Sequence, residues 1–132
     1  MSRKSARETA FKTIFEIPFH DTETPVDIIT YCADCSEELK NQNDKDYYKA
    51  VTSACFENLQ EIDGKISGAL HGWTMNRISK VNLSILRLAV CEIIYFQDIP
   101  YQVSINEAIE LSKKYGDDDS PNFINGILAA LV

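Results

Sequence analysis

The most constraining feature of this sequence is a nearly unbroken apolar stretch from Val81 to Phe96. Read at 3.6 residues per turn, its hydrophobic side chains cover most of the circumference of a helix, a pattern typical of a helix at the centre of a core. Polar residues inside such a helix must reach solvent or find partners. About sixteen residues are too few to span a membrane, so the stretch predicts the central helix of a soluble bundle. Its polar interruptions are Asn82, Ser84, Arg87 and Glu92.

Helical patterns also occupy the segments on both sides of this stretch, and none of them alternates as a strand would. Thr24 followed by Pro25 indicates a helix start, and Ser104 with Glu107 fits a capping box that begins another helix. Trp73 is expected to anchor the core. The prediction is one all-α domain over residues 1–132 with about seven helices. The expected helices cover residues 2–17, 25–39, 46–59, 60–73, 81–96, 105–115 and 121–131.

Charge is distributed unevenly along the chain. The formal net charge is −7, but residues 1–12 carry four cations against Glu8, so this segment has +3 and the other 120 residues carry −10. Cations in the first turn of a helix oppose its dipole, which indicates that they serve a partner rather than helix stability. A solvated, frayed terminus is the alternative. A basic N-terminal end on an otherwise acidic protein predicts that the basic end binds phosphate and that the acidic surface attracts a basic protein.

The cysteines and histidines indicate neither a metal site nor a catalytic site. Cys55 and Cys91 fall at apolar positions of expected helices and read as small buried hydrophobes. The Cys32–Cys35 pair has no second ligand pair and lies within a helix, unlike a redox motif. His20 and His71 have no neighbour in a triad-like spacing. The polar, charged start is unlike a signal peptide. We therefore expect no cofactor, no metal, no enzyme activity and a cytoplasmic location.

Several segments of the second half have a specific order and spacing, above all Ile105-Asn106-Glu107-Ala108 and Phe123-Ile124-Asn125-Gly126. With Ile85-Leu86-Arg87-Leu88-Ala89 before them, they resemble the NusB family of bacterial transcription antitermination factors. The opening Arg3-Lys4-Ser5-Ala6-Arg7-Glu8 is similar to the arginine-rich beginning of that family. The resemblance is strong over residues 77–131, clear over 3–15 and weak between 16 and 60.

The resemblance implies a fold of two small helical sub-bundles. It also implies binding of boxA-type single-stranded RNA together with NusE, the small-subunit ribosomal protein that doubles as an antitermination factor. The pair would act within the RNA polymerase antitermination complex, suppress termination in ribosomal RNA operons, and need no catalytic chemistry.

The same resemblance assigns residues to the two partners. For RNA, cations of the first segment would contact phosphate and bases, and Phe123 would stack on an unpaired base. Asp119 would accept a hydrogen bond from a base edge or limit nonspecific binding. From the pattern alone, Phe123 reads as a core position and Asp119 as charge compensation at a helix start. The RNA-binding residues are Arg3, Lys4, Arg7, Asp119 and Phe123, and the partner-binding residues are Phe15 and Asn82.

Three positions depart from the family pattern. Ser5 stands where another arginine is common, which predicts a smaller salt dependence, by roughly 0.7 per lost phosphate contact. Asn82 replaces an acid, and Phe15 replaces a tyrosine, on the side that faces NusE. Two alternative functions stay open. One is an RNA-positioning module that works with a ribosomal RNA methyltransferase, and the other is a homo-oligomeric helical scaffold, including a homodimer through the first helix.

Overall fold

The computed structural model describes residues 3–19, 24–70 and 74–132, apart from the side chains of Arg3 and Phe19. His20, His71 and Trp73 lie outside these ranges. The described residues form seven α-helices and two short 3-10 helices, and they contain no strand. The all-α prediction is therefore confirmed. The helices are α1 (Arg3–Glu16), α2 (Pro25–Cys35), α3 (Gln42–Glu57), α4 (Leu59–Gly68), α5 (Lys80–Tyr95), α6 (Tyr101–Tyr115) and α7 (Ser120–Ala129), with η1 (Ile17–Phe19) and η2 (Met75–Arg77).

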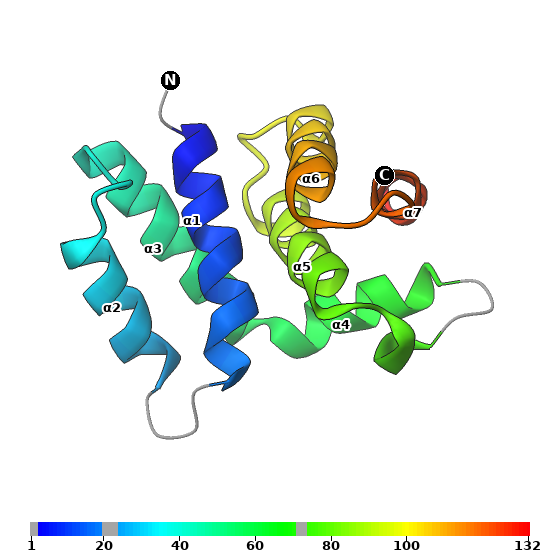
Figure 1. The fold of residues 1–132 in the computed structure, drawn as a ribbon, viewed down its shortest axis with the longest axis horizontal. Coiled ribbons are helices and arrows are strands. Elements are labelled where there is room, and N and C mark those ends of the chain that lie inside the picture. The colour runs from blue at the N-terminus through cyan, green and yellow to red at the C-terminus, as the bar shows by residue number, and fades with distance from the viewer. Residues whose placement is uncertain (1–2, 20–23, 71–73) are drawn as a thin grey trace.

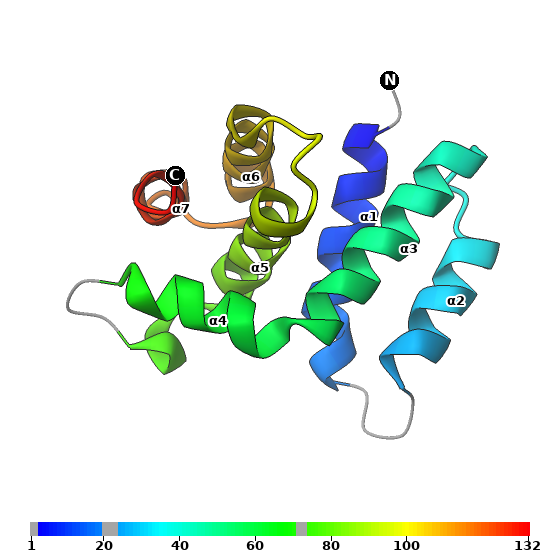
Figure 2. The same cartoon turned by 180° about the vertical axis from the view of Figure 1, so that it is seen from behind.

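The helices form two groups that meet at α5. Helices α1, α2 and α3 pack together on one side, and α4, α6 and α7 pack around α5 on the other (Figure 1). Helix α5 also contacts α1 and α3, so it joins the two groups. Seen from behind, α4 crosses near one end of α5, and α6 stands beside α5 (Figure 2). The expected central helix and the two sub-bundles are thus both observed.

Two of the polar interruptions of α5, Arg87 and Glu92, find partners on other helices. Ser79 caps the helix by accepting a hydrogen bond from the Asn82 backbone N–H at 3.1 Å. The guanidinium of Arg87 donates two hydrogen bonds to Asp63 of α4, at 2.9 and 2.8 Å, and so ties α4 to α5. Glu92 is 1% exposed and accepts hydrogen bonds from other helices. The side chains of Arg87 and Glu92 therefore both connect this apolar helix to its neighbours.

Several predicted helix boundaries were wrong, and local capping explains them. Helix α3 begins at Gln42 because the Asn41 side chain accepts from the Asp44 backbone N–H at 2.9 Å. Helix α2 ends at Cys35, where Ser36 turns extended and the chain buries Leu39 in the core. Helix α4 ends at Gly68 rather than at residue 73.

The predicted capping box at Ser104 is also wrong. Helix α6 begins at Tyr101, directly after Pro100, so Ser104 already lies inside the helix. Its hydroxyl donates to Glu92 Oε1 at 2.7 Å instead of capping a backbone amide. The sequence pattern predicts a local cap, whereas the serine makes a contact between two helices.

The buried cysteines behave as predicted. Cys55 and Cys91 are fully buried in the core, and the four cysteines are free thiols. Burial raises the pKa of the Cys55 thiol to about 12 and also raises the pKa of Cys91. Both thiols therefore stay protonated at neutral pH and pack as small hydrophobic groups.

Candidate nucleic-acid interface

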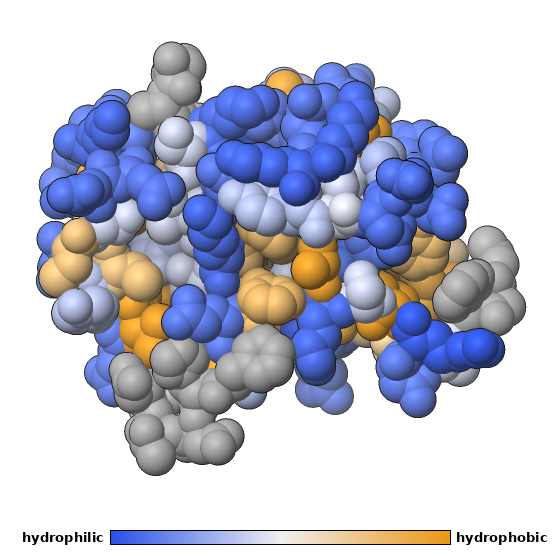
Figure 3. Space-filling model, in the orientation of Figure 1, coloured by the Kyte–Doolittle hydropathy of each residue, from blue (hydrophilic) through white to orange (hydrophobic). Residues whose placement is uncertain are grey.

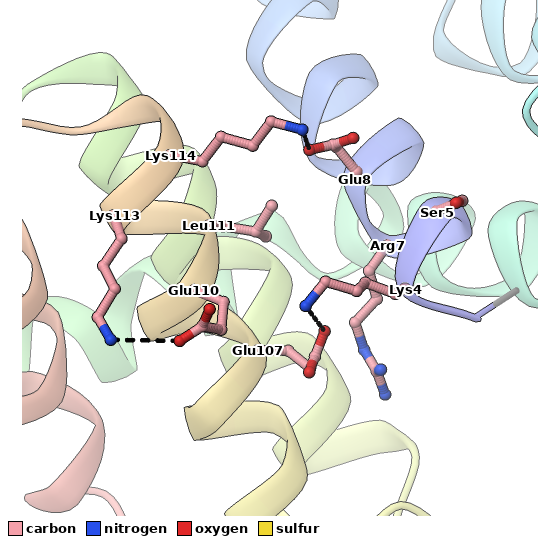
Figure 4. Close-up of a pocket in the computed structure, with 9 residues that line it drawn as sticks. All are labelled: Lys4, Ser5, Arg7, Glu8, Glu107, Glu110, Leu111, Lys113 and Lys114. Atoms are coloured by element: carbon pink, nitrogen blue, oxygen red, sulfur yellow. Dashed lines mark hydrogen bonds and ion pairs between the residues drawn. The ribbon is translucent and has the colours of Figure 1, made fainter. Parts of the chain in front are cut away.

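A charged cleft separates α1 from α6, and it holds two of the residues expected to bind RNA. We call it the α1–α6 cleft; its volume is about 470 Å³. Lys4 and Arg7 approach it from α1, and Figure 4 shows lysines of both helices reaching acids inside it. Cations slightly outnumber acids here, so the cleft is close to neutral. It is lined by Lys4, Ser5, Arg7, Glu8, Glu107, Glu110, Leu111, Lys113 and Lys114.

Ion pairs cross this cleft from one helix to the other. Lys114 Nζ lies 2.7 Å from Glu8 Oε2, and Lys4 Nζ lies 4.0 Å from Glu107 Oε1 (Figure 4). The lysine side chains remain 60–69% exposed. Exposed pairs of this kind contribute little stability and exchange readily with other charges. A phosphate that enters the cleft would therefore compete with carboxylates for these lysines.

Protonation reinforces the pair between Glu8 and Lys114. Partial burial tends to raise the pKa of Glu8, but hydrogen bonds from Lys114 and Tyr115 outweigh it, so the pKa is lowered. The hydrogen bond to Glu8 correspondingly raises the pKa of Lys114. Both partners are charged at neutral pH, and the ion pair is present under the conditions in which RNA would bind.

Arg7 differs from the other cations of the first segment. It is 6% exposed, and its Nε donates to Glu92 Oε2 at 2.8 Å, while the guanidinium lies over the ring of Tyr47 at 5.6 Å. Burial opposes its charge, but the hydrogen bond and the charge of Glu92 prevail and raise the pKa of Arg7. The guanidinium is thus permanently charged and committed to a carboxylate inside the protein.

A second concave surface brings together three of the residues singled out from the sequence. This α5–α7 hollow has a volume of about 260 Å³ and lies between the start of α5 and the turn that joins α6 to α7. Asn82, expected to face the protein partner, lies in it beside Asp119 and Phe123, expected to face RNA. It is lined by Arg77, Ile78, Ser79, Asn82, Asp117, Asp119 and Phe123.

The side chains of the hollow are suited to different contacts. Phe123 is half-buried and packs against the core, so only part of its ring faces outward. Asp119 is exposed, and its backbone N–H is held by the Asp117 carboxylate at 3.0 Å. The Oδ1 atom of Asn82 is buried and accepts no hydrogen bond from the residues that the structure describes. The hollow combines an aromatic surface with carboxylate and amide groups, as recognition of an unpaired base requires.

Gly116 allows the turn beside this hollow to close tightly. A Cβ atom at this position would lie 2.5 Å from Ser120 Oγ and 2.8 Å from the Ser112 carbonyl oxygen. Ser120 is the first residue of α7, one position before the predicted start of the last helix, and its Oγ accepts a hydrogen bond from the Asp117 N–H at 3.0 Å. The close approach of Gly116 and Ser120 therefore sets where Asp119 stands.

Phe15 lies in a third, apolar surface, which we call the Phe15 groove. Its volume is about 480 Å³, and the ring of Phe11 packs at a tilt against that of Tyr115, with centroids 5.1 Å apart. Figure 3 shows hydrophilic residues over the ends of α1 and α6, and hydrophobic surface lower on the same face, between α1 and the start of α5. The groove is lined by Phe11, Lys12, Phe15, Glu16, Val81 and Tyr115.

The three surfaces adjoin one another along the chain. Tyr115 of the Phe15 groove follows Lys114 of the α1–α6 cleft, and Val81 of the groove precedes Asn82 of the α5–α7 hollow.

A model of the NusB family matches residues 4–132. This chain belongs to the NusB family.

Proteins named as members of the same family match this chain over nearly their whole length. The transcription antitermination protein NusB of Natranaerobius thermophilus is 46% identical over 129 residues, which are 97% of this chain and 92% of that protein. The protein of the same name from Alkaliphilus oremlandii is also 46% identical, over all of this chain and 94% of its own.

Solved NusB structures share the fold. The T. maritima NusB has a TM-score of 0.87 and 36% identity, covering 98% of this chain and 89% of that one. The structure of antitermination factors NusB and NusE in complex with double-stranded RNA has a TM-score of 0.86 and 28% identity, covering 98% and 95%.

The sequence patterns did not predict the glutamates that line the α1–α6 cleft or the contacts that Arg7 makes with other helices. Glu8 and Glu107 line the cleft, whereas the sequence pattern placed Glu107 in a capping box and in the family motif and assigned it no part in RNA binding. The partners of Arg7 come from distant parts of the chain, so no local sequence pattern predicts them. Within the described ranges, no helix is long and apolar enough to cross a membrane. Those ranges also contain no group of three or more His, Cys, Asp or Glu side chains that could hold a metal ion.

Proposed function

We propose that this chain is a transcription antitermination factor that binds boxA-type single-stranded RNA together with NusE. In this role it promotes transcription of ribosomal RNA operons by RNA polymerase, works in the cytoplasm and needs no catalytic group. Residues 1–132 act as one RNA-binding domain. The observation that carries the proposal is that surfaces suited to phosphate, to an unpaired base and to a protein are linked by neighbouring residues, Lys114 with Tyr115 and Val81 with Asn82.

Each surface has a distinct part in this proposal. Lys4, which is exposed, contacts phosphate at the α1–α6 cleft, and Arg3, which precedes it at the start of α1, is a further RNA-binding residue. In the α5–α7 hollow, Phe123 stacks on an unpaired base, and Asp119 accepts a hydrogen bond from a base edge. The pre-existing ion pairs of the cleft weaken nonspecific attraction, which agrees with a need for NusE to hold the RNA in place.

The protein partner covers the Phe15 groove. Phe15 and its neighbours supply an apolar contact, and Lys12 and Glu16 stand at its rim. Asn82 adjoins the groove through Val81 and also lines the hollow with Phe123, so we place it where RNA and NusE meet. This arrangement explains how the partner strengthens RNA binding without contacting every base.

The test is the binding of a fluorescent boxA strand, a scrambled strand and a duplex, with and without NusE, at two salt concentrations. We expect preference for the boxA strand, and we expect NusE to increase it. Phe123→Ala weakens RNA binding by about 5- to 150-fold, since stacking of a base contributes about 1–3 kcal/mol. Phe15→Ala removes the gain from NusE and leaves binding without NusE unchanged.

The matched control is Tyr31→Ala, which removes an aromatic side chain that is 69% exposed on α2 and lines none of the three surfaces. Equal binding to the boxA and scrambled strands in the presence of NusE would overturn the proposal. A duplex bound as well as the boxA strand would overturn its single-stranded part.

The exposed apolar character of the Phe15 groove also suits a homo-oligomeric scaffold, which would bury the same surface between copies. Light scattering over a range of protein concentrations, with and without NusE, separates the two functions. A dimer that persists when NusE is added would favour the scaffold. Co-purification with a ribosomal RNA methyltransferase in place of NusE would favour the RNA-positioning module.

A further inference from the structure

One carboxylate in the middle of the molecule collects contacts from both helical groups. Glu92 of α5 accepts at Oε2 from Arg7 of α1, at 2.8 Å, and from the hydroxyl of Tyr47 of α3. At Oε1 it accepts from Ser104 of α6, at 2.7 Å. We call these four residues the Glu92 junction. Since α1 and α3 belong to one group and α5 and α6 to the other, the junction ties the two groups together.

Arg7 cannot leave this junction without a large penalty. Its side chain is 7% exposed and that of Glu92 is 1% exposed. If the guanidinium turned outward to a phosphate, it would abandon a carboxylate that is shielded from water, and an unpaired buried charge is strongly unfavourable. Its ring contact with Tyr47 would be lost as well. The charge of Arg7 is therefore already used inside the protein.

Lys4 stands in the opposite situation, although it lies on the same helix three residues earlier. Its side chain is 69% exposed and reaches across the α1–α6 cleft toward Glu107. Residues at this spacing share one face of a helix. The direction in which Lys4 points is thus set by the position of α1, and the Glu92 junction holds α1 against α5 and α6.

From this geometry we propose that Arg7 is a positioning residue for RNA binding and contacts no phosphate itself. Through Glu92 it sets α1 so that Lys4 faces the cleft. This inference deepens the proposed function and rests on it. It replaces the assignment of Arg7 to the RNA-contacting set, which came from the resemblance to the family's arginine-rich segment.

The number of phosphate contacts can be counted from the salt dependence of binding, since each contact contributes roughly 0.7 to the slope for a single strand. We expect Lys4→Ala to lower the slope by about this amount. Arg7→Gln leaves the slope unchanged and weakens binding by roughly tenfold, the scale on which losing a supporting partner weakens a preorganised site. Arg7→Lys, which keeps the charge but loses the planar fork, weakens binding in the same way.

Glu92→Gln provides the sharpest contrast. If Arg7 only positions α1, this variant weakens RNA binding about as much as Arg7→Gln, and the double variant binds no worse than either single variant. If Arg7 contacts phosphate, Glu92→Gln releases the guanidinium and strengthens binding, while Arg7→Gln lowers the slope. The second set of results would overturn the inference.

Control variants separate these outcomes from changes in net charge or in folding. Lys49→Gln removes an exposed cation of α3 that lines none of the three surfaces, and it corrects for the change in net charge. Each variant is confirmed as folded by circular dichroism under the binding conditions. Ser104→Ala, a milder change to the same junction, should also weaken binding without changing the slope, and replaces Glu92→Gln if that variant does not fold.

Failure of the inference and failure of the proposed function give different results. Every slope is measured on the scrambled strand as well as on the boxA strand, since phosphate contacts are counted whatever the sequence. Equal binding to both strands would overturn the proposed function. The salt slopes would still show whether Arg7 contacts phosphate. Absence of all RNA binding by the unaltered protein overturns both.

Discussion

The Glu92 junction and the α1–α6 cleft both attach α1 to the second helical group through pairs of opposite charge, but in different surroundings. At the junction, Arg7 and Glu92 are 7% and 1% exposed and lie 2.8 Å apart. In the cleft, the pairs of Lys4 with Glu107 and of Lys114 with Glu8 have lysines that are 60–69% exposed. Burial strengthens attraction and removes the competing water, so the junction is permanent, whereas the cleft pairs can be exchanged.

A cation near the start of α1 can therefore serve the fold or a ligand, depending on how deeply its side chain is buried. Sequence neighbours with the same charge were grouped together because the pattern carries no information about burial. Four predictions test this contrast.

The largest effect is expected for Glu92→Gln, which keeps the shape of the side chain but leaves Arg7 charged and unpaired in the interior. Breaking one side of a buried pair lowers the free energy of unfolding by about 3–5 kcal/mol. Urea unfolding measures the loss. Glu110→Gln is the control, since this acid of α6 is 52% exposed. A loss for Glu92→Gln no larger than the control would show that the junction behaves as a surface pair.

A smaller loss is expected for Ser104→Ala. The hydroxyl donates to Glu92 Oε1, and a hydrogen bond to a charged buried group contributes about 1.5–3 kcal/mol. Ser112→Ala is a close control on the same helix, since Ser112 is also buried but donates to the carbonyl of Ile109 in its own helix. Equal losses from the two alanine variants in urea unfolding would show that Ser104 has no special part in the junction.

Changes in the cleft should alter RNA binding and leave stability nearly intact. Lys4→Ala and Glu107→Gln each change the free energy of unfolding by no more than about 1 kcal/mol, as exposed pairs do. Their effects on RNA affinity have opposite signs, because Glu107 competes with phosphate for Lys4. Fluorescence anisotropy should show weaker binding for Lys4→Ala and up to about fivefold tighter binding for Glu107→Gln. A parallel loss in both variants would contradict exchange of partners in the cleft.

The smallest effect is an acid dependence from Glu8. Its pKa is lowered in the folded protein, so the pair with Lys114 stabilises the fold above the ordinary glutamate pKa. That contribution disappears as the pH falls through the lowered value. Thermal unfolding near neutrality and near about pH 4 should show a slightly steeper acid loss for the unaltered protein than for Glu8→Gln. Identical pH profiles would show that the pair adds nothing to stability.

Local patterns predicted most of the fold and the general character of the site. The all-round apolar stretch predicted α5 as the central helix, and its ends lie within one residue of those observed. Boundaries failed where a cap overrode the hydrophobic period, as at Asn41, or where a residue was recruited by another helix, as at Ser104. The resemblance located the residues of the α5–α7 hollow, although it assigned Asn82 to a different partner from Asp119 and Phe123.

The sequence by itself determined that this chain forms helices, that α5 lies at their centre and that cations gather at the start of α1, because periodicity and charge are written locally along the chain. Only the tertiary structure decided which of those cations is available. Arg7 and Glu92 are 85 positions apart, and Tyr47 and Ser104 join them from two further helices. A contact of this kind exists only after packing has brought distant segments together and excluded water from between them.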